Sequence, residues 1–378
     1  MLKKFLSLVL VLCFVFSFVA CNEELNDASG NTEENSSEDQ SREFEDMYYV
    51  ELGVEESIFD FEGIIASKEI TSVKLAGAIL SKTAYTYSQG VISLISKEIA
   101  QFPLGETEME IVTKDKIYKV NVCILTKYIT TAAQFVKMPQ YNGKMLENNR
   151  WSYDGYFVLG NNITADGYEI DSQGIYTGNY DSKQRHEKEG FQGVFDGRGY
   201  TVDGLTLGGY ITNGVFGTIG EHAIVKNVAF TNVRYSTKRH DCTWGGIAAN
   251  VIGGTVQNVF FHTDEAFYAP FMYITNGSII KNVVSYGDNF VLYGFVSMVD
   301  SNEEHYITSE HNYAFTNVKA FDDARNRLNG LTWFNTKSYL TDIRFGTTDF
   351  AEIFDCTKTG CWRISAKYSF PVFKTSSF

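Results

Sequence analysis

The chain has 378 residues, with 46 acidic and 32 basic side chains and a formal net charge of −14. This surplus argues against nucleic acid and anionic lipid surfaces as partners, because both repel a negatively charged protein. The six cysteines and six histidines have no spacing typical of a zinc site, and no phosphate loop or nucleophile motif is present. We therefore expect neither a metal nor a cofactor.

The N-terminal segment 1–20 is predicted to be a signal peptide. Two lysines precede an apolar run from Phe5 to Ala20, which is short for a membrane span. Cys21 directly follows a small residue, and this junction resembles the signal of bacterial lipoproteins. The resemblance implies that the cleaved chain begins at Cys21, which carries a lipid. The protein would then be anchored at the bacterial cell surface or on the extracytoplasmic face of a membrane. An ordinary secretory signal is the alternative.

Residues 21–46 are predicted to be a disordered acidic tether. From Asn22 to Asp46 there are ten acidic residues and one basic residue, with few apolar side chains. Such a composition cannot offset the entropy lost on ordering the chain. A tether here would lift the folded part away from the membrane.

Residues 47–127 are predicted to form a small β-sandwich. Apolar and polar residues alternate in Ile70–Leu75 and in Thr107–Ile111, the period of strands with one buried face. Tyr85–Glu106 combines a strand, a short helical turn and a Leu-Pro-Gly-like corner in an order that resembles immunoglobulin-like modules. These modules stand beside glycan-active domains in bacterial surface proteins, and the resemblance implies a spacer more often than a binding module.

Residues 128–345 begin with a short helix, expected over Thr130–Lys137 from its threonine cap. Short sequence motifs, called phrases below, then recur along the segment. An apolar-x-Asn-Val phrase occurs four times, and a second phrase precedes the first three copies by 12 or 13 residues. The asparagines of the four copies are Asn227, Asn258, Asn282 and Asn317. Two β-phrases at a fixed offset, with variable insertions between copies, predict a solenoid of stacked parallel strands.

Three phrases carry a resemblance to a known family: Gly193–Val202, Gly214–Gly217 and Val225–Val228. They resemble the glycine-rich GLUG-type repeats of bacterial surface proteins over about residues 150–320. The resemblance implies an all-β fold, a right-handed parallel β-helix of the pectate-lyase-like architecture, preceded here by the immunoglobulin-like sandwich. The segment 346–378 resembles the closing stretch of such proteins.

Asp196 and Asp203 stand among four glycines in Gly193–Leu205. Two carboxylates could be the acid and base of a glycoside hydrolase. We favour a structural turn, in which Gly197 and Gly199 adopt positive φ angles and Asp196 accepts backbone hydrogen bonds. The repeated asparagines are interpreted similarly, as a ladder of stacked side-chain amides rather than a ligand site.

The strongest candidate for ligand binding is the insertion 234–244. It contains the densest basic cluster of the chain followed by an aromatic residue: Lys238, Arg239, His240 and Trp244. Basic groups could bind the carboxylates of an acidic glycan while an aromatic ring packs on a sugar face. The alternative is a solvated loop whose tryptophan packs on the solenoid. Elsewhere, Cys356 and Cys361 could close a disulfide loop, and Cys123 is expected to be a buried thiol.

The sequence therefore favours a non-catalytic, lipid-anchored surface protein that binds a glycan or a host surface through loops of the β-helix. A polysaccharide lyase or glycoside hydrolase is the first alternative, because β-helix enzymes assemble their sites from separate coils. A purely structural surface protein is the second alternative. No catalytic residue is assigned.

Overall fold

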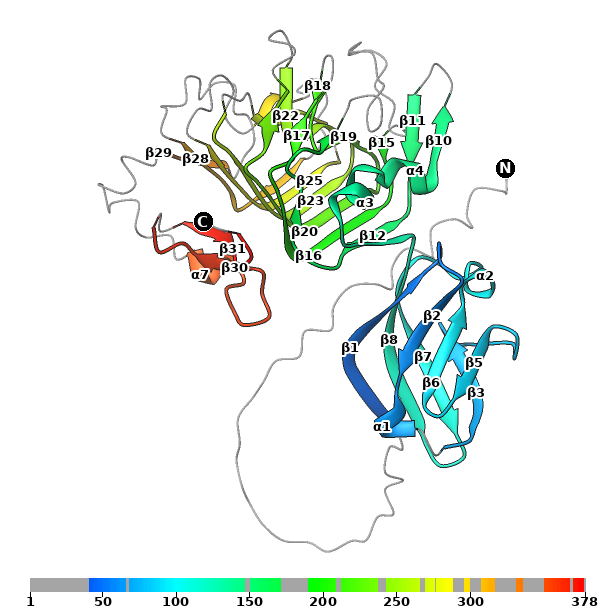
Figure 1. Ribbon diagram of the computed structural model, residues 1–378. Coiled ribbons are helices and arrows are strands. Elements are labelled where there is room, and N and C mark those ends of the chain that lie inside the picture. Colours follow the sequence, from blue (N-terminus) through cyan, green and yellow to red (C-terminus); the bar gives the residue numbers. More distant parts are fainter. Residues whose placement is uncertain are drawn as a thin grey trace, which may run out of the picture. The chain divides into compact units, whose positions relative to one another are not determined.

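The computed structural model describes residues that all belong to one unit, Ser41–Phe378. The described ranges are 41–65, 68–146, 150–170, 190–208, 212–236, 243–265, 269–275, 277–287, 296–299, 307–316, 331–335, 350–367 and 370–376. The protein is mostly β, and parallel sheets form its larger part (Figure 1). Residues 1–40, with the expected signal peptide and Cys21, lie outside the described residues.

Residues 41–125 form two sheets in which most strands pair antiparallel, with strand orders β1-β8-β7-β3-β4 and β2-β6-β5. Their elements are β1 (Ser41–Glu51), β2 (Glu56–Asp60), α1 (Glu62–Ile65), β3 (Ile70–Leu75), β4 (Ala78–Ile79), β5 (Tyr85–Ser88), β6 (Val91–Ile95), α2 (Ser96–Ile99), β7 (Gly105–Thr113) and β8 (Ile117–Leu125). Alternating side chains such as Met109 and Ile111 are fully buried in a shared core with Ile92 and Leu94. The alternation in the sequence thus produces strands with one buried face.

Strand β1 begins inside the segment 21–46 that the sequence predicts as a tether. Ser41 pairs with Ile117, and the parallel pairing with β8 continues to Glu51, with a shift between Phe44 and Met47. Strand β1 therefore begins six residues before the predicted boundary at Met47. Backbone pairing with a neighbouring strand does not depend on the acidic side chains that suggested disorder.

From Lys127 onward the strands pair mainly in parallel, in three sheets. The ten-stranded sheet contains β9 (Lys127–Ile129), β12 (Tyr156–Leu159), β13 (Ile163–Thr164), β16 (Val194–Asp203), β20 (Ile224–Thr231), β23 (Thr255–Thr263), β25 (Ile279–Gly287), β27 (Thr308–Glu310), β28 (Asn312–Thr316) and β29 (Leu331–Asn335). The eight-stranded sheet contains β10 (Gly143–Leu146), β11 (Arg150–Tyr153), β15 (Gly190–Phe191), β18 (Thr212–Asn213), β19 (Phe216–Ile219), β22 (Thr243–Val251), β24 (Ala269–Ile274) and β26 (Val296–Val299). The third sheet has the order β14 (Glu169–Ile170), β17 (Thr206–Leu207), β21 (Arg234–Tyr235).

The chain visits these sheets in turn, so each pass adds a neighbouring strand. In Figure 1, β16, β20, β23 and β25 run side by side. Val228 of β20 pairs with Val259 of β23, which pairs with Val283 of β25. All three side chains belong to the largest apolar cluster of the parallel sheets, which we call the inner core. Because side chains alternate along a strand, the next residues, including Ala229 and Phe260, lie in a separate cluster on the opposite face. This sheet is therefore apolar on both faces.

Two short helices close one part of the inner core, α3 (Ala132–Val136) and α4 (Met138–Asn142). Thr131 caps α3: its side chain accepts a hydrogen bond from the backbone N–H of Gln134, and the Gln134 side-chain oxygen accepts one from the backbone N–H of Thr131. The cap directs Phe135 inward, where its ring lies 5.8 Å from that of Phe195 and 6.3 Å from that of Phe230.

The C-terminal segment covers the opposite face of the ten-stranded sheet. Its described elements are α7 (Phe350–Ile353), β30 (Trp362–Ile364) and β31 (Pro371–Phe373). Phe370 stacks on Phe315 of β28 with ring centroids 4.1 Å apart, and Trp362 is buried in the same cluster. Cys356 and Cys361 are both thiols, so the expected disulfide is not formed in this structure. The hydrogen bond from the Trp362 amide to the Asp355 carbonyl closes this loop instead.

Candidate functional site

Four polar side chains form a column that crosses the ten-stranded sheet, one from each successive pass. Asn282 Nδ2 donates to Asn258 Oδ1 over 3.0 Å, and Asn258 Nδ2 donates to Asn227 Oδ1 over 3.0 Å. Asn227 Nδ2 in turn donates to Asp196 Oδ1 over 3.1 Å. All three asparagines have φ angles between 51° and 56°, a left-handed conformation that asparagine tolerates better than most residues. The repeat spacing therefore produces a structural column that ends on a carboxylate.

The column ends at a bulge in β16, where the register shifts between Asp196 and Tyr200. Asp196 Oδ1 also accepts a hydrogen bond from the Arg198 backbone N–H over 2.8 Å. The sequence predicts positive φ angles at Gly197 and Gly199. The residues that adopt them are instead Arg198 (φ 51°) and Gly199 (φ 83°). Gly197 is required for a different reason, because a Cβ there would lie 2.5 Å from the Asn227 carbonyl oxygen.

The fourth repeated asparagine does not align with this column. Lys281 pairs with Glu310 and Val284 with Tyr313, so His311 is the partner of Asn282 in register. His311 has the same positive φ, 52°. Asn317 follows Thr316, which pairs with Gly287, and itself lies outside the described residues. The sequence motif placed this asparagine by local similarity, whereas strand pairing sets the register.

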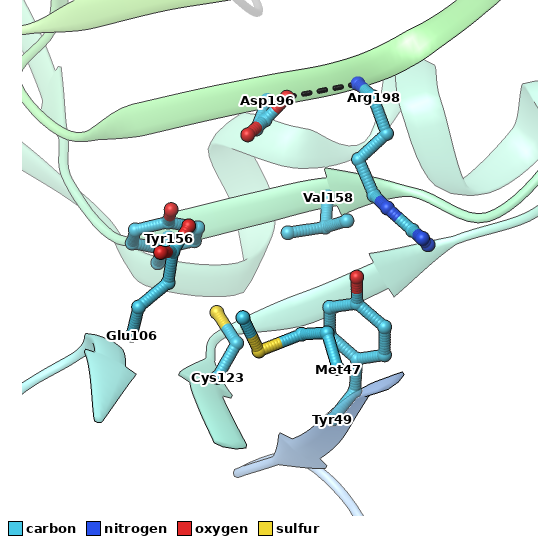
Figure 2. Close-up of a pocket in the computed structure, with 8 residues that line it drawn as sticks. All are labelled: Met47, Tyr49, Glu106, Cys123, Tyr156, Val158, Asp196 and Arg198. Carbon is cyan, nitrogen blue, oxygen red and sulfur yellow. Dashed lines mark hydrogen bonds between the residues drawn. The ribbon is translucent and has the colours of Figure 1, made fainter. Parts of the chain in front are cut away.

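A cavity of about 200 Å³ lies beside the bulge, where the antiparallel sheets meet the first parallel strands (Figure 2). Its lining residues come from five strands, β1, β7, β8, β12 and β16: Met47, Tyr49, Glu106, Cys123, Tyr156, Val158, Asp196 and Arg198. Cys123, Tyr156 and Val158 are also members of a small apolar cluster at this junction. We call this space the junction cavity.

Two of the three charged side chains at the junction cavity, Asp196 and Arg198, are engaged with neighbours. Lys226 Nζ lies 3.2 Å from Asp196 Oδ2, so both carboxylate oxygens of Asp196 have partners. The Arg198 guanidinium carbon lies 4.9 Å from the centre of the Tyr49 ring, and Figure 2 shows the side chain reaching toward that ring. Glu106 is exposed at the cavity. A carboxylate held on both oxygens is poorly placed to transfer a proton to a substrate.

The nucleophilic groups of the cavity stay protonated at neutral pH. Burial, reinforced by the charge of Glu106, raises the pKa of Cys123 to about 12. Burial also raises the pKa of Tyr49 to about 12, although Arg198 opposes this shift. Because the thiolate is the reactive form of cysteine, Cys123 is an unreactive buried thiol.

Asp203 belongs to a separate network at the other end of β16. It accepts hydrogen bonds from Thr231 Oγ1 over 2.5 Å and from Asn232 Nδ2 over 2.7 Å. The Asn232 backbone N–H donates to Nδ1 of His262, a residue 1 % exposed. Asp196 and Asp203 thus support two different corners, and neither is paired with the other.

Of the four residues predicted to bind a ligand, the structure describes only Trp244. Lys238, Arg239 and His240 lie outside the described residues. Trp244 lies on β22, with its backbone opposite Asn213 of β18. Within the described ranges, no group of three or more His, Cys, Asp or Glu residues could hold a metal ion. None of the helices described there is long and apolar enough to cross a membrane.

Searches of protein-family models, curated proteins and solved structures gave no match to this chain. The junction cavity was not anticipated from the sequence. Its lining residues are scattered from Met47 to Arg198, and no local motif links them.

Proposed function

We propose that this chain is a lipid-anchored bacterial surface protein in which an immunoglobulin-like module precedes a right-handed parallel β-helix. In this proposal the β-helix is a rigid scaffold that binds a glycan or host surface without chemical turnover. The ordered addition of parallel strands and the polar column across them support the β-helix. The two antiparallel sheets around one core support the module.

The non-catalytic part of the proposal rests on the hydrogen bonds and the ion pair that occupy the Asp196 carboxylate. Asp196 is 8 % exposed, and its oxygens bind a backbone N–H, an asparagine amide and a lysine. The adjoining cavity of about 200 Å³ is smaller than the roughly 300–1,000 Å³ of typical small-molecule sites. Such a site is better suited to holding the fold than to enclosing a polysaccharide.

The proposed function is tested with the mature chain carrying Cys21→Ser, which removes the lipid attachment site. The protein is passed over immobilised uncharged, carboxylated and aminated glycans, and the ultraviolet absorbance of unsaturated sugar products is followed. We expect retention on at least one glycan and no rise in absorbance. Product formation would favour a lyase, and absence of both retention and product would favour a structural protein.

The anchor is tested separately by comparing wild-type Cys21 with Cys21→Ser in cells. Wild-type chain should fractionate with membranes and release into detergent, whereas the variant should appear in the soluble fraction. Equal membrane association of both would overturn the proposed lipid anchor and leave the glycan proposal standing.

A further inference from the structure

Strands β1 and β8 form the only parallel pair among the described strands of the two antiparallel sheets (Figure 1). Their register contains nine residue pairs, from Ser41 opposite Ile117 to Glu51 opposite Leu125. Because the two strands run in the same direction, the start of β1 and the end of β8 lie at opposite ends of the pair. At about 3.3 Å per residue, these two ends are roughly 25–30 Å apart.

The chain enters and leaves this pair at those opposite ends. The N-terminal segment 1–40 is joined to the pair at Ser41, and β9 begins at Lys127, two positions after the end of β8. A pull on segment 1–40 against the parallel sheets therefore acts on the two strands in opposite directions, and β1 must slide past β8. Antiparallel pairing would place both connections at one end, where the pair opens one hydrogen bond at a time.

Backbone hydrogen bonds between β1 and β8 resist this sliding together. The Leu52 N–H donates to the Leu125 carbonyl over 3.0 Å. In a parallel ladder every second residue faces the partner strand, which directs the N–H groups of Val50 and Tyr48 toward β8 as well. Because sliding stretches all of these bonds at once, the load is shared among them.

Glu51 fastens the end of β1 to the connection that carries the load. Its N–H and carbonyl face away from β8, where they bond to Ser57 Oγ of β2 over 3.3 Å and to Ser96 Oγ of α2 over 3.1 Å. Its carboxylate, 13 % exposed, accepts from the Tyr128 N–H over 3.0 Å and is paired with Lys127 Nζ. The end of β1 is thus held to β2, α2 and β9 as well as to β8.

We propose that β1 and β8 form a mechanical clamp, which keeps residues 41–125 folded when the N-terminal segment and the parallel sheets are pulled apart. This inference rests on the proposed function, because a protein anchored at Cys21 and bound to a second surface is under tension when the surfaces separate. Forced unfolding is governed by the unfolding rate and not by the equilibrium free energy. The direction of pull can therefore change the resistance of the module without any change in its stability.

The test pulls the same protein in two directions in an optical trap. The mature Cys21→Ser chain carries one DNA handle at its N-terminus and a second through an azide-bearing residue introduced at Thr130 or at Asp115. Thr130 is exposed directly after β9, so this handle makes β1 slide past β8. Asp115 is exposed just before β8, near the start of β1, so this handle opens the pair from one end. We expect a rupture force several-fold higher through Thr130 than through Asp115 at equal loading rate.

Two variants at one position isolate a bond of the clamp. Tyr48→Pro removes a backbone N–H that faces β8, whereas Tyr48→Ala removes the same ring and keeps the N–H. Through Thr130, Tyr48→Pro should lower the rupture force well below that of Tyr48→Ala, while through Asp115 the two should differ little.

Equal rupture forces in the two directions would overturn the clamp, and so would equal forces for the two Tyr48 variants through Thr130. The comparison of directions uses no strand variant, so it decides the proposal even where Tyr48→Pro does not fold. Neither measurement involves a glycan or a membrane. A failed clamp therefore leaves the proposed function standing, and the glycan and fractionation experiments can fail without altering the measured forces.

Discussion

The polar column and the junction cavity lie side by side, but they are built in different ways. The column uses one residue type at one register position, and each asparagine bonds to the next across neighbouring strands. The cavity gathers eight dissimilar residues from segments up to about 150 positions apart. The column thus depends on repetition and the cavity on single contacts. We therefore expect damage to the repeating part to cost far more stability than damage to the junction.

The largest effect should come from the inner core that the repeats enclose. Phe230 is fully buried and contacts both Phe216 and Phe135. Phe230→Ala should lower the free energy of unfolding by about 3–5 kcal/mol, through lost burial and a residual cavity. Urea denaturation measures this change. Ile79→Ala, at a side chain 70 % exposed, is the control and should change stability by no more than about 0.5 kcal/mol. A smaller loss at Phe230 than at Ile79 would contradict the described core.

Within the column, Asn258 should matter most because it bonds on both sides. Asn258→Ala removes both bonds and places alanine at a φ of 52°, so a loss of about 2–4 kcal/mol is expected. Asn258→Gly removes the same bonds but permits the backbone angle, and it should recover about 1 kcal/mol of that loss. Equal stability of wild type and both variants, measured by thermal and urea unfolding, would show that the column contributes nothing.

Stability should also fall at high pH because of Cys123. Its pKa is raised from 9.0 to about 12 in the folded chain, so the folded state retains a proton that the unfolded state releases. The contribution is present below pH 9 and is lost as the pH rises from 9 to 12. Cys123→Ala should therefore show a shallower decline than wild type over this range, in urea titrations at several pH values. Parallel declines would mean that the thiol is accessible to water.

The smallest effect should come from the contact between Arg198 and Tyr49 at the junction. Arg198→Gly keeps the positive φ available, and Tyr49→Leu keeps an apolar side chain. A double-mutant cycle should give a coupling of about 0.5–1 kcal/mol, the range of exposed cation–π pairs. Strictly additive effects would show that the contact between Arg198 and Tyr49 does not stabilise the junction of the antiparallel and parallel sheets.

Repetition also explains what could be predicted from the sequence. The positions of Asn227 and Asn258, and the helix capped by Thr131, follow from local phrases whose spacing is visible in the chain. Asn317 did not follow, because variable insertions between passes break the link between sequence spacing and strand register. The start of β1 at Ser41 was missed because composition predicts solvation, whereas the strand is fixed by its partner β8.

The candidate site was harder to predict than the fold. The sequence drew attention to charged clusters such as Lys238–His240, since adjacent charges are visible in a linear chain. Met47, Cys123 and Arg198 have no spacing that connects them until the strands bring them together at the junction cavity. Sites assembled from single residues of separate strands are thus concealed in the sequence, even when the pattern that predicts the strands is evident.

The central claim is that the parallel sheets are a scaffold that binds a glycan without cleaving it. The most direct measurement incubates the mature Cys21→Ser chain with soluble uncharged, carboxylated and aminated glycans in turn and records both binding and polymer length by size-exclusion chromatography. We predict co-elution of the protein with at least one glycan at unchanged polymer length. Progressive shortening of a glycan, or elution of the protein apart from every glycan, would contradict the account.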